Sequence, residues 1–160
     1  MKIFESVSEI QRFLDGLRSA GETVGFVPTM GALHQGHLEL IKQAQLENQK
    51  VVCSIFVNPL QFNRKEDLDS YPDRLQQDKD LLQAVGCDCL FLPTRDSMYP
   101  EKPQMDFDFG SVGEGMEAEH RPNHFEGVAA VVRRFFEILR PDKAYFGEKD
   151  YQQLAIIRWL

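Results

Sequence analysis

Few cysteines, no long apolar stretch and no excess of basic charge set the first limits on this chain. The 160 residues contain three cysteines, Cys53, Cys87 and Cys89. A small, odd number of cysteines, in a chain whose N-terminus does not resemble a signal peptide, indicates reduced thiols and a cytoplasmic protein. No apolar run approaches the roughly 20 residues that a membrane-spanning helix needs, so we expect no membrane partner.

The charge balance and the glycine pattern exclude further classes of binding protein. A net charge of −7, from 18 basic and 25 acidic residues, opposes a broad nucleic-acid-binding surface, which needs a basic field. Local basic spots would still suit a small anion. The sequence contains neither a G-x-G-x-x-G fingerprint nor a Walker A loop. With 42% hydrophobic residues, the chain is long enough to form one domain with its own core.

What the sequence does contain is an alternation of strand-like and helical segments. Apolar strands are predicted at 23–28, 51–58, 87–93 and 143–147. Helical spacing predicts helices at 7–18, 38–44, 73–85, 125–140 and from 148 onward. Strands that are apolar on both faces are typical of a parallel sheet covered by helices. The predicted fold is therefore an α/β doubly wound parallel sheet, with ligands at the carboxyl ends of its strands.

Several finer expectations concern local structure. Ser6 and Glu9 have the spacing of a capping box at the start of the first helix. Cys87 and Cys89 alternate along a predicted strand, so they should point to the same face of the sheet. The segment 94–123 is rich in proline and glycine, and its one candidate strand is 105–110. Residues 58–72 are expected to form a polar loop.

The most informative stretch is FVPTMGALHQGHLELIKQA, residues 26–44, where His34 and His37 lie at a strand-to-helix turn. A helix N-terminus offers unpaired N–H groups and a partial positive charge. Gly36 would let a ligand approach the backbone closely, and both imidazoles could donate to phosphate oxygens. The stretch therefore predicts a phosphate site. A surface turn with incidental histidines stays open as the alternative, because so short a motif also occurs by chance.

Two other strand ends carry polar side chains. Lys149, within the run 148–150, could meet phosphates as a point charge, or the run could be a solvated turn. Asn58 and Gln61 are neutral amides that suit the hydroxyl or carboxylate groups of a small substrate. The alternative for Asn58 is a turn that caps its own backbone. Because the carboxyl ends of parallel strands meet in one crevice, we expect these groups to converge there.

A zinc site is a further alternative. Cys87, Cys89, His120 and His124 superficially supply four zinc ligands. However, C-x-C on a strand cannot easily wrap around one ion, and structural zinc sites generally use C-x2–4-C. We therefore interpret the two cysteines as core residues, and expect the two histidines to lie over the crevice or at the surface.

Six motifs occur in one order along the chain: VPTMGALHQGH, SIFVNPLQF, DLDSYPDRLQQD, MYP, RPNHFEGV and FGEKDYQQL. Together they resemble the pantoate–β-alanine ligase family, over about residues 23–160. The resemblance implies a Rossmann-like fold of the H-x-G-H nucleotidylyltransferase type. It also implies an ATP-dependent, AMP-forming acid–amino acid ligase of pantothenate and coenzyme A biosynthesis. Pantoate would attack the α-phosphate of ATP to give pantoyl adenylate, and β-alanine would then displace AMP to give pantothenate.

The resemblance further implies roles for individual residues. The catalytic residues would be His34, His37 and Lys149. The ATP contacts would come from these three residues together with Met30, Gly36, Gly147 and Asp150. The pantoate pocket would be lined by Met30, Gln61 and Gln153, with Asn58 nearby. The border of the crevice would be formed by Tyr71, Glu117 and His124.

Magnesium would be held mainly by the ATP phosphates, with help from the helix after Tyr71. Relatives carry an acidic pair there, where this chain has Gln76, Gln77 and Asp78. Asp78 is therefore the one metal ligand that the resemblance implies.

Members of the family continue into a second, smaller domain and carry a serine–serine–arginine loop that residues 1–160 do not contain. We therefore expect residues 1–160 to be a single Rossmann-like ATP- and pantoate-binding domain, with the family's C-terminal domain absent from this chain. The resemblance also implies a homodimer. Two alternatives remain open: a domain that binds ATP and pantoate without turnover, and another nucleotidylyltransferase that shares the H-x-G-H motif.

Overall fold

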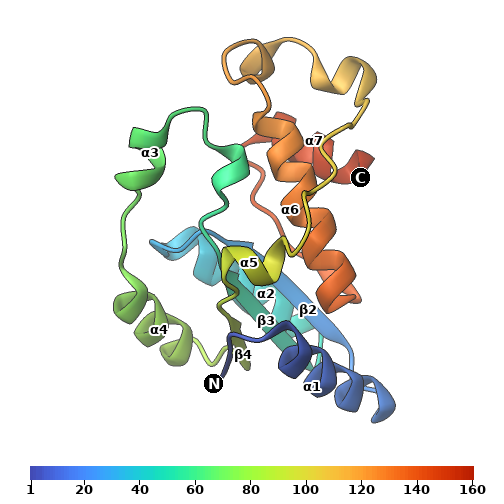
Figure 1. Ribbon diagram of the computed structural model, residues 1–160. Coiled ribbons are helices and arrows are strands. Elements are labelled where there is room, and N and C mark those ends of the chain that lie inside the picture. The colour runs from blue at the N-terminus through green and yellow to red at the C-terminus, as the bar shows by residue number, and fades with distance from the viewer.

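A five-stranded, wholly parallel sheet forms the centre of the computed structural model, which describes residues 1–160 (Figure 1). Its strand order is β1-β4-β3-β2-β5. The strands are β1 Lys2–Phe4, β2 Val24–Thr29, β3 Lys50–Ile55, β4 Cys89–Phe91 and β5 Lys143–Ala144. The predicted α/β doubly wound parallel sheet is confirmed.

Helices connect the strands and cover both faces of the sheet. The α-helices are α1 Val7–Ser19, α2 Gln35–Glu47, α3 Lys65–Asp69, α4 Leu75–Ala84, α5 Arg95–Met98, α6 His124–Leu139 and α7 Tyr151–Trp159. Three short 3-10 helices are η1 Pro59–Gln61, η2 Gly110–Gly113 and η3 Met116–Glu119. The five long helices, α1, α2, α4, α6 and α7, are those that the helical spacing predicts. None of the helices is long and apolar enough to cross a membrane.

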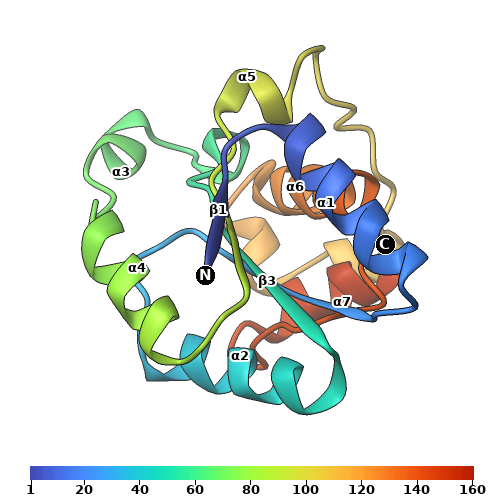
Figure 2. The same cartoon turned by 90° about the horizontal axis from the view of Figure 1, so that it is seen from below.

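Two apolar clusters, one on each face of the sheet, form most of the core. Phe26 and Val52 pack with α1 and α6, whereas Val27, Val51 and Cys53 pack with α2 and α4. Successive residues of one strand point to opposite faces, so a strand apolar throughout contributes to both clusters. The view from below shows α2 and α4 on one side of the strands and α1 and α6 on the other (Figure 2).

The order of the strands places a crevice at the carboxyl ends of β2 and β5. From β2 the chain moves through β3 to β4 on one side, while β5 pairs with the other edge of β2. The helix α2 follows β2 on one face, and α7 follows β5 and packs beside α6 on the other. Ligands of doubly wound sheets bind where connections leave in opposite directions in this way.

Two sequence predictions about strands and loops need correction. The edge strand β1 was not predicted, and residues 105–110 form no strand. The rings of Phe107 and Phe109 instead stack at 5.6 Å between centroids, and both meet Trp159 edge-on. The predicted polar loop 58–72 contains η1 and α3. Aromatic packing and local turns, which an alternating pattern does not distinguish from strands, account for these differences.

Two side-chain expectations were also wrong. Ser6 is the N-cap residue of α1, but its side chain makes no capping hydrogen bond and lies 2.9 Å from Ser8 Oγ. Cys87 and Cys89 belong to different core clusters. Cys87 precedes β4, and the alternation of faces applies only inside a strand. Both cysteines are buried, as expected of core residues.

Candidate functional site

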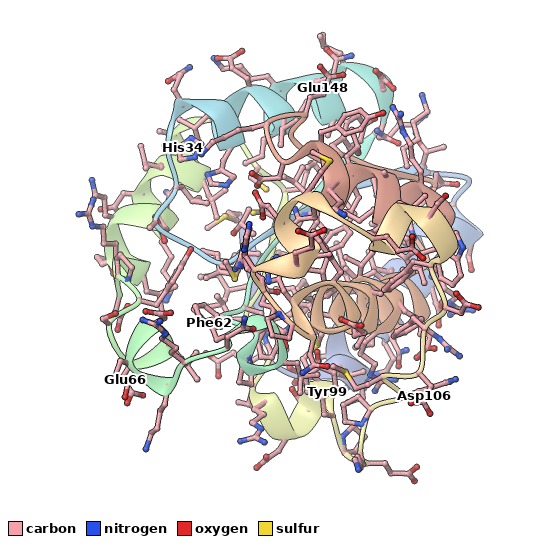
Figure 3. The ribbon with its side chains drawn as sticks, turned by 90° about the horizontal axis from the view of Figure 1, so that it is seen from above. His34, Phe62, Glu66, Tyr99, Asp106 and Glu148 are labelled. Atoms are coloured by element: carbon pink, nitrogen blue, oxygen red, sulfur yellow. The ribbon has the colours of Figure 1, made fainter.

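A cavity of about 220 Å³ lies at the crevice, between the carboxyl ends of the strands and the helices α6 and α7. Its polar and sulfur-bearing lining comes from three connections: Met30 and His37 after β2, Asn58 and Gln61 after β3, and Asp150 and Gln153 after β5. Figure 3 looks down on this end of the molecule and labels His34 at the start of α2, Phe62 after η1 and Glu148 in the β5–α7 loop. The predicted convergence of three strand ends is therefore observed.

The two histidines of the turn are fixed by backbone hydrogen bonds. His34 is the N-cap residue of α2, and its Nδ1 accepts the N–H of Gly36 at 3.1 Å. The Nδ1 of His37 accepts the N–H of His34 at 3.3 Å, so each residue caps the other. The ring centroids are 4.0 Å apart. A neutral imidazole that accepts through Nδ1 carries its proton on Nε2, so both rings keep an N–H donor that the protein does not use.

Gly36 makes room for this arrangement. A Cβ atom at Gly36 would lie 2.9 Å from Cε1 of His34, which is closer than a side chain tolerates. The close approach that this glycine permits is therefore that of the His34 ring, folded back over the first turn of α2.

The pKa of His37 is lowered, first by burial and second by the neighbouring His34, while the Asp78 carboxylate acts in the opposite direction. Burial disfavours the charged form of an imidazole. His37 is therefore neutral near pH 7 and presents Nε2–H as a donor without carrying a net charge. His34 is exposed at the rim and does not line the cavity itself.

Asp78 does not face the crevice as a metal ligand would. It is 1% exposed, and its two carboxylate oxygens accept the backbone N–H groups of Ala32 and Leu33, each at 2.8 Å. Both oxygens are thus committed to the loop that precedes His34. No group of three or more His, Cys, Asp or Glu side chains in the chain could hold a metal ion. This burial does not favour Asp78 as a magnesium ligand, a role that stays a prediction.

Asn58 is saturated by partners within the protein. Its Nδ2 donates to Gln61 Oε1 at 3.1 Å and to the Gly127 carbonyl at 3.0 Å. Its Oδ1 accepts from Leu60 N at 3.3 Å and from the Tyr99 hydroxyl at 3.0 Å. An amide has two donor hydrogens and two acceptor positions, so nothing remains for a ligand. The alternative that Asn58 caps its own turn is confirmed, and its amide orients Gln61.

Gln61 and Gln153 both line the cavity, one after β3 and the other after β5. The Nε2 of Gln61 lies 3.1 Å from the sulfur of Met30, and its backbone carbonyl accepts from Nδ1 of His124 at 2.9 Å. Gln153 lies on the first turn of α7, and its side chain makes no hydrogen bond within the chain, so its amide is available to a ligand in the cavity. His124 is 3% exposed, and burial lowers its pKa. His124 thus supports η1 from behind rather than lining the cavity.

The loop between β5 and α7 carries the remaining predicted residues. Gly147 and Lys149 are exposed and do not line the cavity, and Lys149 makes no ion pair or hydrogen bond. Asp150 lines the cavity and is the N-cap residue of α7. The structure therefore brings seven predicted residues into the cavity wall, because Tyr71 lines it as well. The predicted residues that lie outside the wall are His34, Gly36, Asp78, Glu117, His124, Gly147 and Lys149.

Sequence reasoning missed the apolar wall of the cavity. Several large apolar side chains form it: Phe56, Val128, Val131, Val132, Phe135, Phe146 and Ile157. The signal was present in the helix at 124–139, whose residues are buried around most of its circumference. A helix so apolar covers more than the sheet alone. Part of its face closes the cavity, which can therefore receive an aliphatic group.

A family model described as pantoate-beta-alanine ligase matches residues 2–160. The chain belongs to the pantoate–β-alanine ligase family. Pantothenate synthetase from Allorhizobium ampelinum is 51% identical over 158 residues, covering 99% of this chain and 55% of that protein. Pantothenate synthetase from Porphyromonas gingivalis is 50% identical over 158 residues, with 99% and 56% covered. The chain thus spans about half the length of the curated relatives it matches.

Solved structures of the family share the same fold. Pantothenate synthetase from Thermus thermophilus aligns with a TM-score of 0.88 and 46% identity, over 99% of this chain and 56% of that one. Pantoate-beta-alanine ligase from Francisella tularensis aligns with a TM-score of 0.90 and 40% identity, over 99% and 60%. The Francisella enzyme was solved in complex with beta-gamma ATP and beta-alanine.

Proposed function

We propose that residues 1–160 form the ATP- and pantoate-binding domain of a ligase that condenses pantoate with β-alanine, with ATP cleaved to AMP and pyrophosphate. One observation carries the proposal. The Nδ1 atoms of His34 and His37 are held by the backbone at the start of α2, so both Nε2–H donors are free beside a cavity with an aliphatic wall. Family membership and a relative solved with beta-gamma ATP and beta-alanine support it.

In the first step, a carboxylate oxygen of pantoate attacks the α-phosphorus of ATP, and pyrophosphate leaves. Negative charge grows on the phosphate oxygens as the new bond forms. The Nε2–H groups of His34 and His37 and the N-terminus of α2 would stabilise that charge. Lys149 would add a full positive charge from the β5–α7 loop. No covalent bond to the protein is needed, because the step depends on positioning and charge stabilisation.

The cavity would hold pantoate during this step. Its apolar wall suits the branched aliphatic end of the molecule, and the amides of Gln61 and Gln153 suit its hydroxyl and carboxylate groups. In the second step, the amine of β-alanine attacks the acyl carbon of pantoyl adenylate. The acyl–phosphate bond breaks, AMP leaves, and pantothenate is released.

Three further proposals concern the metal, the location and the oligomeric state. The chain's own residues do not fit a magnesium cage, since Asp78 is committed to backbone N–H groups. Mg²⁺ would therefore enter with the ATP phosphates. A cytoplasmic location is supported by three free, buried cysteines. A homodimer is supported by the resemblance to the family alone.

The test is pyrophosphate exchange into ATP by the 160-residue chain, with and without pantoate. A His37→Ala variant should abolish pantoate-dependent exchange, because it removes a donor at the cavity wall. His120→Ala is the matched control, since His120 is exposed and lies outside the cavity.

The outcomes separate the candidate functions. Exchange that requires pantoate and His37 supports the proposal. ATP binding without any exchange would favour a domain that binds ATP and pantoate without turnover. Exchange that a different acid supports better than pantoate would favour another nucleotidylyltransferase activity.

A further inference from the structure

We propose that Asp78 is a positioning residue, which sets the conformation of the β2–α2 loop and thereby aims the Nε2–H donors of His34 and His37. The inference rests on the proposed function for its catalytic meaning. The geometry behind it is independent of any substrate, because Asp78 does not line the cavity and would act only through the loop.

Three consecutive backbone N–H groups of this loop bond to side chains instead of to secondary structure. Gly31 N donates to Thr29 Oγ1 at 3.2 Å, and Ala32 N and Leu33 N donate to the two oxygens of Asp78 at 2.8 Å. Successive N–H groups that converge on one anion form a recognised anion-binding arrangement of the backbone. In this protein the anion is a carboxylate of the chain itself.

The loop needs such an anchor because its backbone is strained. Gly31 has φ 84° and Ala32 has φ 51°, and the left-handed region is unfavourable for a residue with a Cβ. A non-glycine residue holds that conformation only when its surroundings impose it. The bidentate contact of Asp78 with the N–H groups of Ala32 and Leu33 imposes it at Ala32.

The anchor lies directly beside the histidines. Leu33, whose N–H is fixed by Asp78, is followed by His34, whose own N–H bonds to His37 Nδ1. A shift of Leu33 therefore moves the N-cap residue of α2 and, with it, both rings. The carboxylate comes from α4, 45 residues further along the chain than Leu33, so a helix outside the cavity wall positions the loop.

The charge of Asp78 is otherwise unpartnered. It forms no ion pair with any Lys, Arg or His of the chain, and it is 1% exposed. A buried charge is unfavourable unless it is hydrogen-bonded. If burial were the only requirement, we would expect a neutral residue at this position. A carboxylate is explained because its two oxygens accept two backbone N–H groups at once.

The test compares Asp78→Asn with Asp80→Asn. Asparagine keeps the size of the side chain but turns an NH₂ group toward one of the two loop N–H groups. Asp80 is an exposed residue of the same helix, whose carboxylate accepts from Gln76 at 2.9 Å. Asp78→Asn should weaken ATP binding at least tenfold and alter the imidazole ¹⁵N signals of both histidines, which report whether Nδ1 or Nε2 carries the proton. Asp80→Asn should change neither.

Two results would overturn the inference. One is a folded Asp78→Asn variant with unchanged imidazole signals and unchanged ATP affinity. The other is rapid hydrogen exchange of the Ala32 and Leu33 amides in the wild type, because the anchor predicts that these amides are protected. This measurement does not depend on whether a variant folds. If the wild type does not bind ATP, the proposed function fails, while the imidazole and exchange measurements still decide the role of Asp78.

Discussion

Each histidine of the turn uses its two ring nitrogens for different purposes. Nδ1 accepts a backbone N–H at the start of α2, which stabilises the helix end, and Nε2–H remains for a ligand. Fixing one nitrogen also fixes the tautomer and the orientation of the other. The structural and the functional contributions of one side chain can therefore be separated by substitution.

The substitutions His34→Asn and His34→Ala separate the structural contribution of this residue from its functional contribution. Asparagine supplies a side-chain oxygen near the position of Nδ1 and is a favourable N-cap residue, but it has no group at the position of Nε2. We expect His34→Ala to lower the free energy of unfolding by about 1 kcal/mol, and His34→Asn to change it little. Both should weaken ATP binding about tenfold, since a hydrogen bond to a charged group contributes about 1.5 kcal/mol or more.

Urea denaturation and titration with ATP would measure the two effects. If His34→Asn binds ATP as tightly as the wild type, Nε2 of His34 has no part in binding. If His34→Ala is as stable as the wild type, the cap observed at Gly36 contributes nothing.

The sequence predicted where the candidate site lies better than it predicted the contacts that each residue makes there. H-x-G-H at a strand-to-helix turn placed His34 and His37 correctly, because the turn is local. The burial of Asp78 was not predicted, since it depends on how α4 packs against a loop distant in sequence. Asn58 was left between two interpretations for the same reason, because two of its four partners, Gly127 and Tyr99, are distant in sequence and are brought to it by folding.

At the scale of secondary-structure elements, the site depends on the contact between α6 and η1. A Cβ atom at Gly127 would lie 2.4 Å from the carbonyl oxygen of Leu60. The helix can approach the backbone of η1 only because residue 127 has no side chain. The Gly127 carbonyl also accepts from Asn58, so the same contact orients the Gln61 amide.

Gly127→Ala should therefore destabilise the protein, although alanine favours helices. The gain in helix propensity is about 1 kcal/mol, whereas forcing a methyl group into a filled space costs about 1–3 kcal/mol. Since the blocking atoms belong to backbone, we expect a net loss of about 1–2 kcal/mol in the free energy of unfolding. Pantoate-dependent exchange should also fall, because η1 and Gln61 must move.

Gly16→Ala is the matched control. Gly16 lies in α1, and a Cβ atom there would meet nothing within 4 Å. This substitution should raise the free energy of unfolding by about 0.5–1 kcal/mol. Equal effects of the two substitutions in urea denaturation would show that the approach of α6 to η1 is not tight.

Elements with strong periodicity were predictable, and the short ones were not. The strands at 23–28 and 51–58 were found because both faces are apolar, as a central parallel strand requires. β1 has only three residues at the edge of the sheet, two of them exposed, so its composition carries no strand signal. Residues 105–110 alternate like a strand, but their two aromatic rings stack on each other and meet Trp159 edge-on.

At the scale of the whole molecule, the order of the strands determines where the candidate site lies. The sequence predicts a parallel sheet and a crevice at the carboxyl ends, but it does not say which strands are neighbours. The order β1-β4-β3-β2-β5 places the loops after β2 and β5 next to each other. Members of the segments 30–37 and 146–153, more than a hundred positions apart, line one cavity for that reason.

The stability of the folded molecule also depends on pH, through two of its histidines. The pKa values of His37 and His124 are both lowered, with burial the largest cause in each case. The unfolded chain, in which a histidine titrates near 6.5, therefore binds more protons than the native protein as the pH falls below that value. The stability that these two groups contribute is fully present above pH 6.5 and is lost as the pH falls through their lowered native pKa values.

We therefore expect the free energy of unfolding, measured in urea, to be level from pH 8 to 7 and to fall from pH 6.5 to 5.5. The slope is limited to about 1.4 kcal/mol per pH unit for each extra proton bound by the unfolded chain. Carboxylates act in a separate, lower pH range. Hydrogen bonding from Lys143 lowers the pKa of Glu47 to about 2, so the contribution of Glu47 to stability persists until the pH falls below about 4.5.

His124→Gln should flatten the slope of stability against pH between pH 6.5 and 5.5, and His120→Gln, at an exposed position, should leave it unchanged. A stability that stays level to pH 5.5 in the wild type would mean that the buried histidines take up protons as readily in the native protein as in the unfolded chain.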